Sequence, residues 1–281
     1  MSALDLTYLG TATLALRAGE TRLLTDPAFD PRGSKYDFGL WFTPRSWFAS
    51  EKLYTSPEVP TGLFDAVLLS HDHHADNLDA VGRTLVADAS RVARVLTTVP
   101  SARRLARDRS PNDAPGKGLG LGARAQGLKP GESTRIGSLA ITAVPARHGP
   151  AYAPQVHQVT GFLIDVDHGP RVWISGDTVM FGDLERELAR IGDERPVDVA
   201  VVHCGAVAFP RALGFGHARF TFDAAEAIAA SRLVQARTIV PVHRSGWAHF
   251  RQPESELFAA FEAAGLGKQT RMLELGATFA L

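Results

Sequence analysis

Apolar and polar positions alternate over the first 26 residues with the period of β-strands. The runs 6–10, 13–18 and 21–26 place apolar side chains at alternate positions, and Gly19 and Glu20 supply a tight turn before the last of them. Such alternation is typical of strands with one buried face. The pattern therefore predicts that the chain opens with short strands joined by tight turns.

Continuous apolar runs, which are typical of strands buried on both faces, occur at 64–70 and 197–205. Shorter runs predict strands at 85–89 and 271–275. Residues 223–236 have the spacing of an amphipathic helix, with Thr221 placed to cap it.

Each half of the chain contains a strand-rich block followed by strand–helix units. That order predicts an α/β protein with two packed sheets and helices outside them, an αββα sandwich. We expect one domain over residues 1–281.

Residues 27–62 form a long segment that has no clear period and is rich in proline, glycine and aromatic residues. Loops of this length inside a compact domain are usually functional or disordered, and the aromatic content argues against disorder. We expect this segment to cover the mouth of a site.

Charge and composition narrow the function classes. Thirty basic and thirty acidic residues cancel, which argues against a general nucleic-acid binder and against a polybasic membrane anchor. No apolar run approaches the roughly 20 residues that cross a bilayer, and the N-terminus has no export-signal pattern. A single cysteine, Cys204, excludes an internal disulfide. We expect a cytoplasmic enzyme with a small-molecule substrate, while its oligomeric state is left open.

Histidine and aspartate residues follow four predicted strands that lie far apart in the sequence. The segment HDHHAD, residues 71–76, follows one strand, and His148, Asp177 and His243 each end another. Ligand sites in α/β sheets gather where the carboxyl ends of strands meet loops. Imidazole and carboxylate together suit a divalent metal ion, so these positions predict a metal site.

On these segments the sequence resembles the metallo-β-lactamase superfamily, in the branch of the ascorbate-6-phosphate lactonase and the N-acyl-phosphatidylethanolamine phospholipase D. The resemblance extends over most of the chain and includes TRLLTDP, the junction SHDHH, VPARH, ISGDT, the helix start from Thr221 to Ala225, and PVHRSGW. It implies two metal ions that share a bridging aspartate, Asp177. His148 would join the first ion and His243 the second.

The chain departs from the family pattern His-x-His-x-Asp-His at the HDHHAD segment. His71 and His73 match the first two histidines, but then Ala75 and Asp76 stand where Asp and His should be. A shifted alignment takes Asp72 and His74 as the first pair and Asp76 as the aspartate, with Asn77 in place of the last histidine. An insertion of one residue, using His71 and Asp76 together, is the third alternative. Thr11 also replaces a histidine that relatives often carry.

Extended backbone projects alternate residues to one side, so His71 pairs with His73, or Asp72 with His74. We favour His71 and His73 with His148 on the first ion, because imidazole suits zinc better than Asp72 does. Asp76 then joins Asp177 and His243 on the second ion, and His74 and Asn77 are secondary.

The predicted function is hydrolysis of an ester, lactone or phosphodiester by a metal-activated water, with Asp72 or Asp76 moving the proton. Two divalent ions are expected, with zinc first and manganese or iron as alternatives; a single ion is another alternative. Two other hypotheses remain: redox or non-hydrolytic chemistry on iron or manganese, and a binding protein that has lost its metal.

Several other residues receive weaker interpretations. Asp26 is a candidate for orienting a histidine, and Arg244 for pairing with an anionic substrate. His203 and Cys204 lie at a plausible edge of the site. The remaining histidines are expected in loops or on the surface: His157, His168, His217 and His249.

Overall fold

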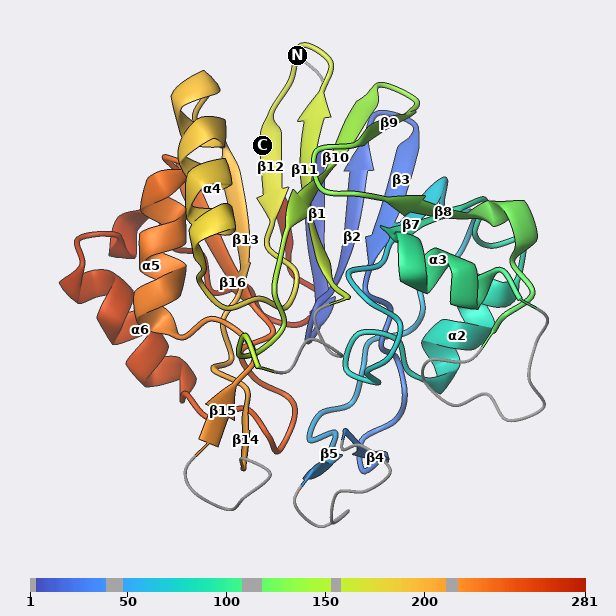
Figure 1. The fold of residues 1–281 in the computed structure, drawn as a ribbon, viewed down its shortest axis with the longest axis horizontal. Coiled ribbons are helices and arrows are strands. Elements are labelled where there is room, and N and C mark those ends of the chain that lie inside the picture. Colours follow the sequence, from blue (N-terminus) through green and yellow to red (C-terminus); the bar gives the residue numbers. More distant parts are fainter. Residues whose placement is uncertain (1–3, 39–47, 108–117, 153–157, 211–216) are drawn as a thin grey trace.

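The computed structural model describes residues 4–38, 48–107, 118–152, 158–210 and 217–281. Two β-sheets lie at its centre, and helices cover their outer faces (Figure 1). This arrangement confirms the predicted αββα sandwich.

The first sheet has seven strands. In spatial order they are β17 (Thr278–Ala280), β1 (Leu4–Gly10), β2 (Thr13–Ala18), β3 (Thr21–Thr25), β6 (Ala66–Leu68), β7 (Val95–Thr98) and β8 (Ala125–Leu128). The strands β1 to β3 are antiparallel, as the alternating pattern predicted, whereas β3, β6, β7 and β8 run parallel to one another.

The second sheet has six strands. In spatial order they are β16 (Thr238–Val242), β13 (Val199–His203), β12 (Arg171–Ile174), β11 (Thr160–Val166), β10 (Leu139–Pro145) and β9 (Ser133–Ile136). The strands β12, β13 and β16 are parallel, so their carboxyl ends meet at one edge. Two small ribbons complete the strands: β4 (Lys35–Asp37) with β5 (Ala49–Glu51), and β14 (Ala208–Pro210) with β15 (His217–Arg219).

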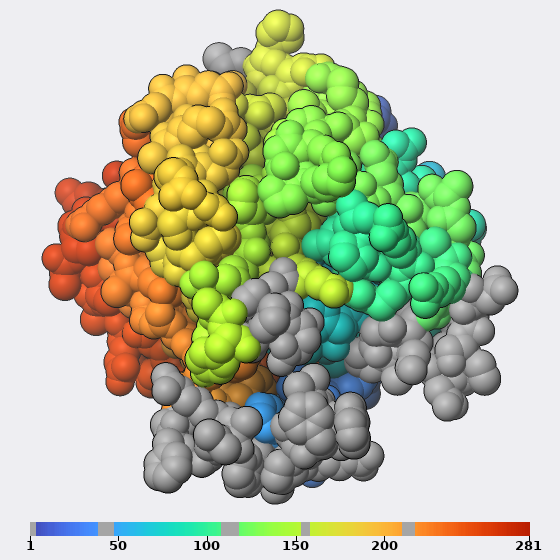
Figure 2. Space-filling view, viewed as in Figure 1, coloured from blue at the N-terminus to red at the C-terminus, as the bar shows by residue number. Residues whose placement is uncertain are grey.

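Helices form the two outer layers. The helices α2 (Ala80–Ala87) and α3 (Val99–Leu105) lie on the side of the first sheet, and α4 (Gly182–Glu194), α5 (Ala224–Leu233) and α6 (Glu254–Ala263) lie on the side of the second (Figure 1). In the space-filling view the orange and red C-terminal helices and the green region around α3 occupy opposite flanks (Figure 2). None of the described helices is long and apolar enough to span a membrane.

Three layers of buried apolar side chains hold the sandwich together, and their burial supplies most of the stabilisation. The central layer joins both sheets and includes Leu6, Leu68, Ile141 and Val240. The outer layers lie between each sheet and its helices, and are represented by Leu85 against the first sheet and Trp173 against the second.

Two strands predicted from the sequence are wrong. Residues 85–87 end α2 instead of forming a strand, because the apolar Leu85 and Val86 pack on the helical side of the first sheet. Residues 271–275 are irregular, and nearby only Thr270 makes an isolated bridge to Ile239. The single domain over residues 1–281 stays a prediction.

Candidate metal centre

Four strands of the two sheets deliver polar side chains to one edge of the sandwich. β6 ends at Leu68 and leads into the segment 71–76, while β12, β13 and β16 end just before or at Asp177, His203 and His243. The sheets are joined at this edge, because the amide of Thr160 on β11 donates to the carbonyl of Ser70 at 3.1 Å.

The first group of candidate ligands consists of His71, His74 and His148, each of which offers one ring nitrogen, and these three atoms lie within 4.8 Å of one another. Nδ1 of His74 lies 3.1 Å from Nε2 of His71 and 3.0 Å from Nε2 of His148. On the far side of its ring, His148 donates from Nδ1 to the carbonyl of Phe220 at 2.9 Å. Because a carbonyl only accepts, the proton of the neutral His148 ring is on Nδ1, and Nε2 presents a lone pair to the group.

Burial keeps these rings neutral. Burial and the neighbouring histidines hold the pKa values of His71 and His74 well below the usual 6.5, and burial lowers that of His148. Neutral imidazole is the form that binds a metal ion.

The second group consists of Asp76, Asp177 and His243, with candidate ligand atoms again within 4.8 Å of one another. Nε2 of His243 lies 3.2 Å from Oδ2 of Asp76 and 3.4 Å from Oδ2 of Asp177. The other oxygen of Asp177, Oδ1, lies 2.8 Å from Nδ1 of His203. All four side chains are buried.

Charges in the second group counteract the effect of burial. Burial alone would raise the pKa of Asp76, but His243 and His249 lower it well below the usual range. Likewise, His243 and His203 outweigh burial and lower the pKa of Asp177. Burial would lower the pKa of His243, but Asp177 and Asp76 raise it.

The backbone of His243 is held in a conformation that is rare for residues other than glycine. Its φ is 50°, in the left-handed region, and its amide donates to the carbonyl of Thr11 at 2.6 Å. Such strained positions persist where the surroundings fix them, and they are frequent at functional sites. Thr11 therefore supports His243 from its backbone.

The geometry groups His74, and not the favoured His73, with His71 and His148. The prediction assumed extended backbone through residue 74, but β6 ends at Leu68 and the chain turns before His71. Histidines three residues apart in the sequence, His71 and His74, then join the same group of candidate ligands, whereas His71 and His73, two residues apart, do not. Nε2 of His73 is buried without a hydrogen-bond partner among the described residues.

Asp72 lies outside both groups. It is fully buried, and its oxygens accept from Arg104 Nε at 3.0 Å, Arg104 Nη2 at 2.5 Å and Ser101 Oγ at 2.9 Å. This ion pair joins the turn after β6 to α3, so the surroundings of Asp72 favour a role in positioning the turn.

Two other interpretations are refined by the structure. Asp26 reaches His71 through Ser70: its Oδ1 accepts from the amide of Ser70 at 2.7 Å, and Ser70 Oγ in turn lies 2.9 Å from Nδ1 of His71. Cys204 is buried, and burial raises the pKa of its thiol to about 12, so the thiol stays protonated.

His249 is the residue that sequence reasoning missed. We expected a loop or surface position, and His249 does lie in the loop after β16, but its side chain is 2% exposed and Nε2 lies 3.0 Å from Oδ2 of Asp76. The one available signal was the aromatic setting of Trp247 and Phe250 in the segment after His243. His168 and His217 are exposed, as expected, and His157 lies outside the described residues.

The donor atoms fit metal ions. Around a tetrahedral ion with bonds of about 2.0–2.1 Å, neighbouring ligand atoms lie roughly 3.3 Å apart. Four of the six donor separations within the two groups, at 3.0–3.4 Å, match that spacing. In the first group, one ring nitrogen from each of three neutral imidazoles points to the same place. These nitrogens have more lone pairs than the protons between them can satisfy by hydrogen bonding.

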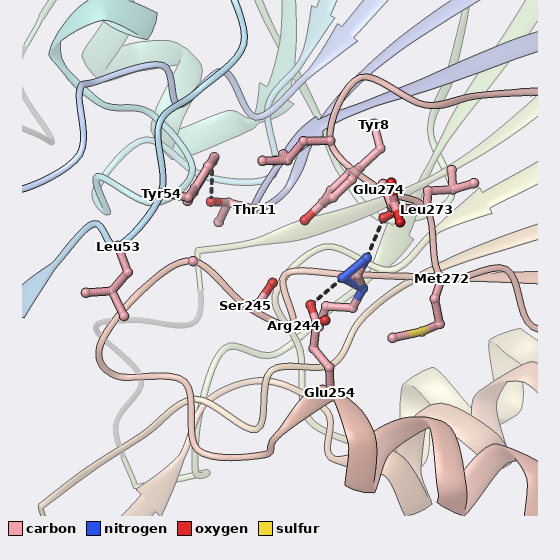
Figure 3. A pocket seen from close by; sticks show the side chains of 13 residues that line it. Tyr8, Thr11, Leu53, Tyr54, Arg244, Ser245, Glu254, Met272, Leu273 and Glu274 are labelled. Atoms are coloured by element: carbon pink, nitrogen blue, oxygen red, sulfur yellow. Dashed lines mark hydrogen bonds and ion pairs between the residues drawn. The ribbon is translucent and has the colours of Figure 1, made fainter.

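A separate cavity of about 690 Å³ is lined in part by the loop that follows β16 (Figure 3). No residue of either ligand group lines it. Arg244 faces this cavity, donating to Glu254 and to the carbonyl of Leu273, both at 2.5 Å. Its guanidinium is thus occupied within the protein.

Two packed sheets with outer helices, and two adjacent groups of buried histidines and aspartates at one edge, define an αββα protein with a candidate dinuclear centre. A family model described as the beta-lactamase superfamily domain matches residues 21–244. The chain belongs to this superfamily, and its fold is that of the metallo-β-lactamases.

Individual relatives agree with this assignment. A protein of Pelotomaculum thermopropionicum named UPF0173 metal-dependent hydrolase is 27% identical over 206 residues, which cover 71% of this chain and 75% of the relative. The structure of an isothiocyanate hydrolase from Delia radicum gut bacteria matches with a TM-score of 0.73 at 17% identity, covering 99% of this chain and 98% of that one. The diiron β-hydroxylase CmlA from Streptomyces venezuelae matches with a TM-score of 0.61 at 18% identity, covering 100% of this chain and 54% of that one. At these identities the two structures establish the fold alone.

Proposed function

We propose that this chain is a hydrolase that depends on two divalent metal ions and cleaves an ester, a lactone or a phosphodiester. The observation that carries the proposal is the pair of adjacent, buried ligand groups at one edge of both sheets. The relative from Pelotomaculum thermopropionicum is itself named a metal-dependent hydrolase. Placement in the branch of the ascorbate-6-phosphate lactonase and the N-acyl-phosphatidylethanolamine phospholipase D is part of the proposal and rests on the sequence motifs.

In this proposal the first ion is held by His71, His74 and His148, and the second by Asp76, Asp177 and His243. Imidazoles with carboxylates suit zinc, and manganese and iron are alternatives. When bound, the ions would supply an activated water and stabilise the negative charge that develops on the substrate.

Proton transfer would fall to Asp76. Its carboxylate is ionised and can accept a proton, but its low pKa makes it a weak base, so Asp76 would pass the proton on to the leaving group and not retain it. We leave Asp72 out of the mechanism because Arg104 and Ser101 occupy its oxygens.

The segment 27–62 would cover the mouth of the site and favour a substrate with an apolar part. The contacts of Phe38 support this, since its ring centroid lies 5.4 Å from that of His74 and 4.7 Å from that of His249. Phe209 stacks on Phe38 at 5.8 Å and extends the aromatic surface. Residues 39–47 of the segment lie outside the described residues.

The test is a panel of lactones, phosphodiesters and acyl esters, assayed before chelation, after exhaustive chelation, and after zinc or manganese is returned. We expect turnover of an active substrate to be lost with the metal and regained with it, because ligand loss removes the activated water. Turnover that survives chelation would contradict the proposal, and metal-dependent oxygen consumption without hydrolysis would favour redox chemistry.

A further inference from the structure

His249 lies next to the second ligand group but is a member of neither group of candidate ligands. Its Nε2 lies 3.0 Å from Oδ2 of Asp76, and Nε2 of His243 lies 3.2 Å from the same oxygen. Each of these two imidazole nitrogens thus lies from the Asp76 oxygen at the separation expected of donor atoms on one ion. The set of donor atoms that all lie within 4.8 Å of one another contains Asp76, Asp177 and His243, and His249 reaches it through Asp76. Such spacing makes His249 a candidate for an additional donor.

Asn77 is adjacent to the same carboxylates but does not supply a donor of this kind. When its side-chain amide is oriented to satisfy the network, the nitrogen donates to Oδ1 of Asp76 at 3.1 Å and to Oδ2 of Asp177 at 3.2 Å. An amide nitrogen has no free lone pair for a metal ion. Asn77 therefore positions the two carboxylates and leaves room in the ligand set for another side chain.

The ring of His249 is fixed from its other side. Its Nδ1 lies 2.5 Å from Oγ of Ser50, on β5. Phe209 stacks on the ring at a centroid distance of 5.3 Å and an angle of 20°, and Phe250 packs edge-on at 4.9 Å. A second hydrogen bond of this kind is what orients a metal-binding histidine and sets its tautomer.

We infer that His249 is a fourth protein ligand of the second ion, beside Asp76, Asp177 and His243. Its Nε2 binds the ion, and its Nδ1–H donates to Ser50. The inference rests on the proposed function, because it requires that ions bind at this edge. It also gives the segment 27–62 a role, since Ser50 of that segment holds a ligand in place.

The experiment measures metal content by elemental analysis after loading with zinc and dialysis, on the full chain and its variants. The unaltered protein should retain two ions, and His249→Ala should retain one. His168→Asn is the matched control: His168 is exposed in the turn between β11 and β12, and asparagine tolerates its left-handed backbone. This control should retain both ions.

A second variant separates a ligand from a residue that only positions Asp76. The amide of His249→Gln can still donate to Asp76, but it is a poor zinc ligand. If His249 binds the ion, the glutamine variant should lose it as the alanine variant does. Retention of two ions by either variant would overturn the inference.

Ser50→Ala adds a graded test. Removing a partner of this kind typically weakens metal binding by roughly 10–100-fold. We therefore expect the dissociation constant of the more weakly bound zinc ion to rise by that factor. An unchanged constant would contradict the role given to Ser50. Should the unaltered protein retain no ion, the proposed function itself would fail, which distinguishes that result from failure of the inference alone.

Discussion

At the scale of single residues, several side chains of the candidate centre are held by a partner that contacts them on the side away from the other candidate ligands. The carbonyl of Phe220 fixes His148, Ser50 fixes His249, and His203 holds the outer oxygen of Asp177. These partners are as much a part of the site as the ligands, because they decide which atom faces the ion.

His203 provides a direct test of the role of these hydrogen-bond partners. We expect His203→Ala to raise the zinc dissociation constant of the second group by roughly 10–100-fold, because Asp177 loses the partner that orients it. The measurement is competition for zinc against a chromophoric chelator, with His217→Ala, at an exposed histidine, as the control. Equal affinities for the two variants would show that His203 does not orient Asp177.

At the scale of elements, the segment 27–62 is attached to α2 through two buried carboxylates. Asp30 of the segment accepts from the amide of Val81 on α2 at 2.9 Å. Asp79 caps the helix by accepting from the amide of Gly82 at 2.8 Å, and it also accepts from the amide of Asp30 at 2.5 Å. Nζ of Lys52 lies 3.6 Å from Asp79, and both side chains are fully buried. The segment is thereby anchored beside the turn that carries the ligands.

We predict that Asp79→Ala lowers the free energy of unfolding by about 3–5 kcal/mol, because it leaves the Lys52 ammonium buried without its counter-charge. Urea denaturation measures this change. Asp183→Ala is the comparison: its partner Arg186 is exposed, and such surface pairs contribute little. A loss for Asp79→Ala no larger than for Asp183→Ala would contradict the structural role of the pair.

The sequence predicted elements well where one periodicity dominated and poorly where a run was short. The alternation in β1 to β3 and the apolar run of β13 identified those strands, whereas Leu85 and Val86 fit a strand and a helix equally. The edge of the site was predictable from strand ends. The grouping of His74 in place of His73 was not predictable, because it depends on where β6 ends. The burial of His249 was not predictable either, because it depends on Ser50, a partner far away in the sequence.

At the scale of the whole molecule, the centre concentrates neutral histidines in the interior. Burial lowers the pKa of His71 and His74 well below 6.5 and that of His73 to about 4. In the unfolded chain the same side chains take up protons near pH 6.5. Below that pH the unfolded state of the metal-free protein therefore binds more protons than the folded state, and stability falls as the pH falls.

We accordingly predict that the metal-free protein loses stability between pH 6.5 and pH 4, with His73 alone contributing at most about 3 kcal/mol. Asp26 and His243, with raised pKa values, and Asp79, with a pKa of about 6, act in the opposite direction but are fewer than the buried neutral histidines. Denaturant unfolding in the presence of a chelator checks this. A free energy of unfolding that is equal or higher at pH 5 than at pH 7 would contradict the assignment of neutral rings.

The most direct test of the central claim is an anomalous difference map from crystals grown with zinc and measured at the zinc absorption edge. We predict two peaks, one among the ring nitrogens of His71, His74 and His148, and the other among Asp76, Asp177 and His243. Absence of any peak at this edge of the sheets, or peaks only elsewhere on the protein, would contradict it.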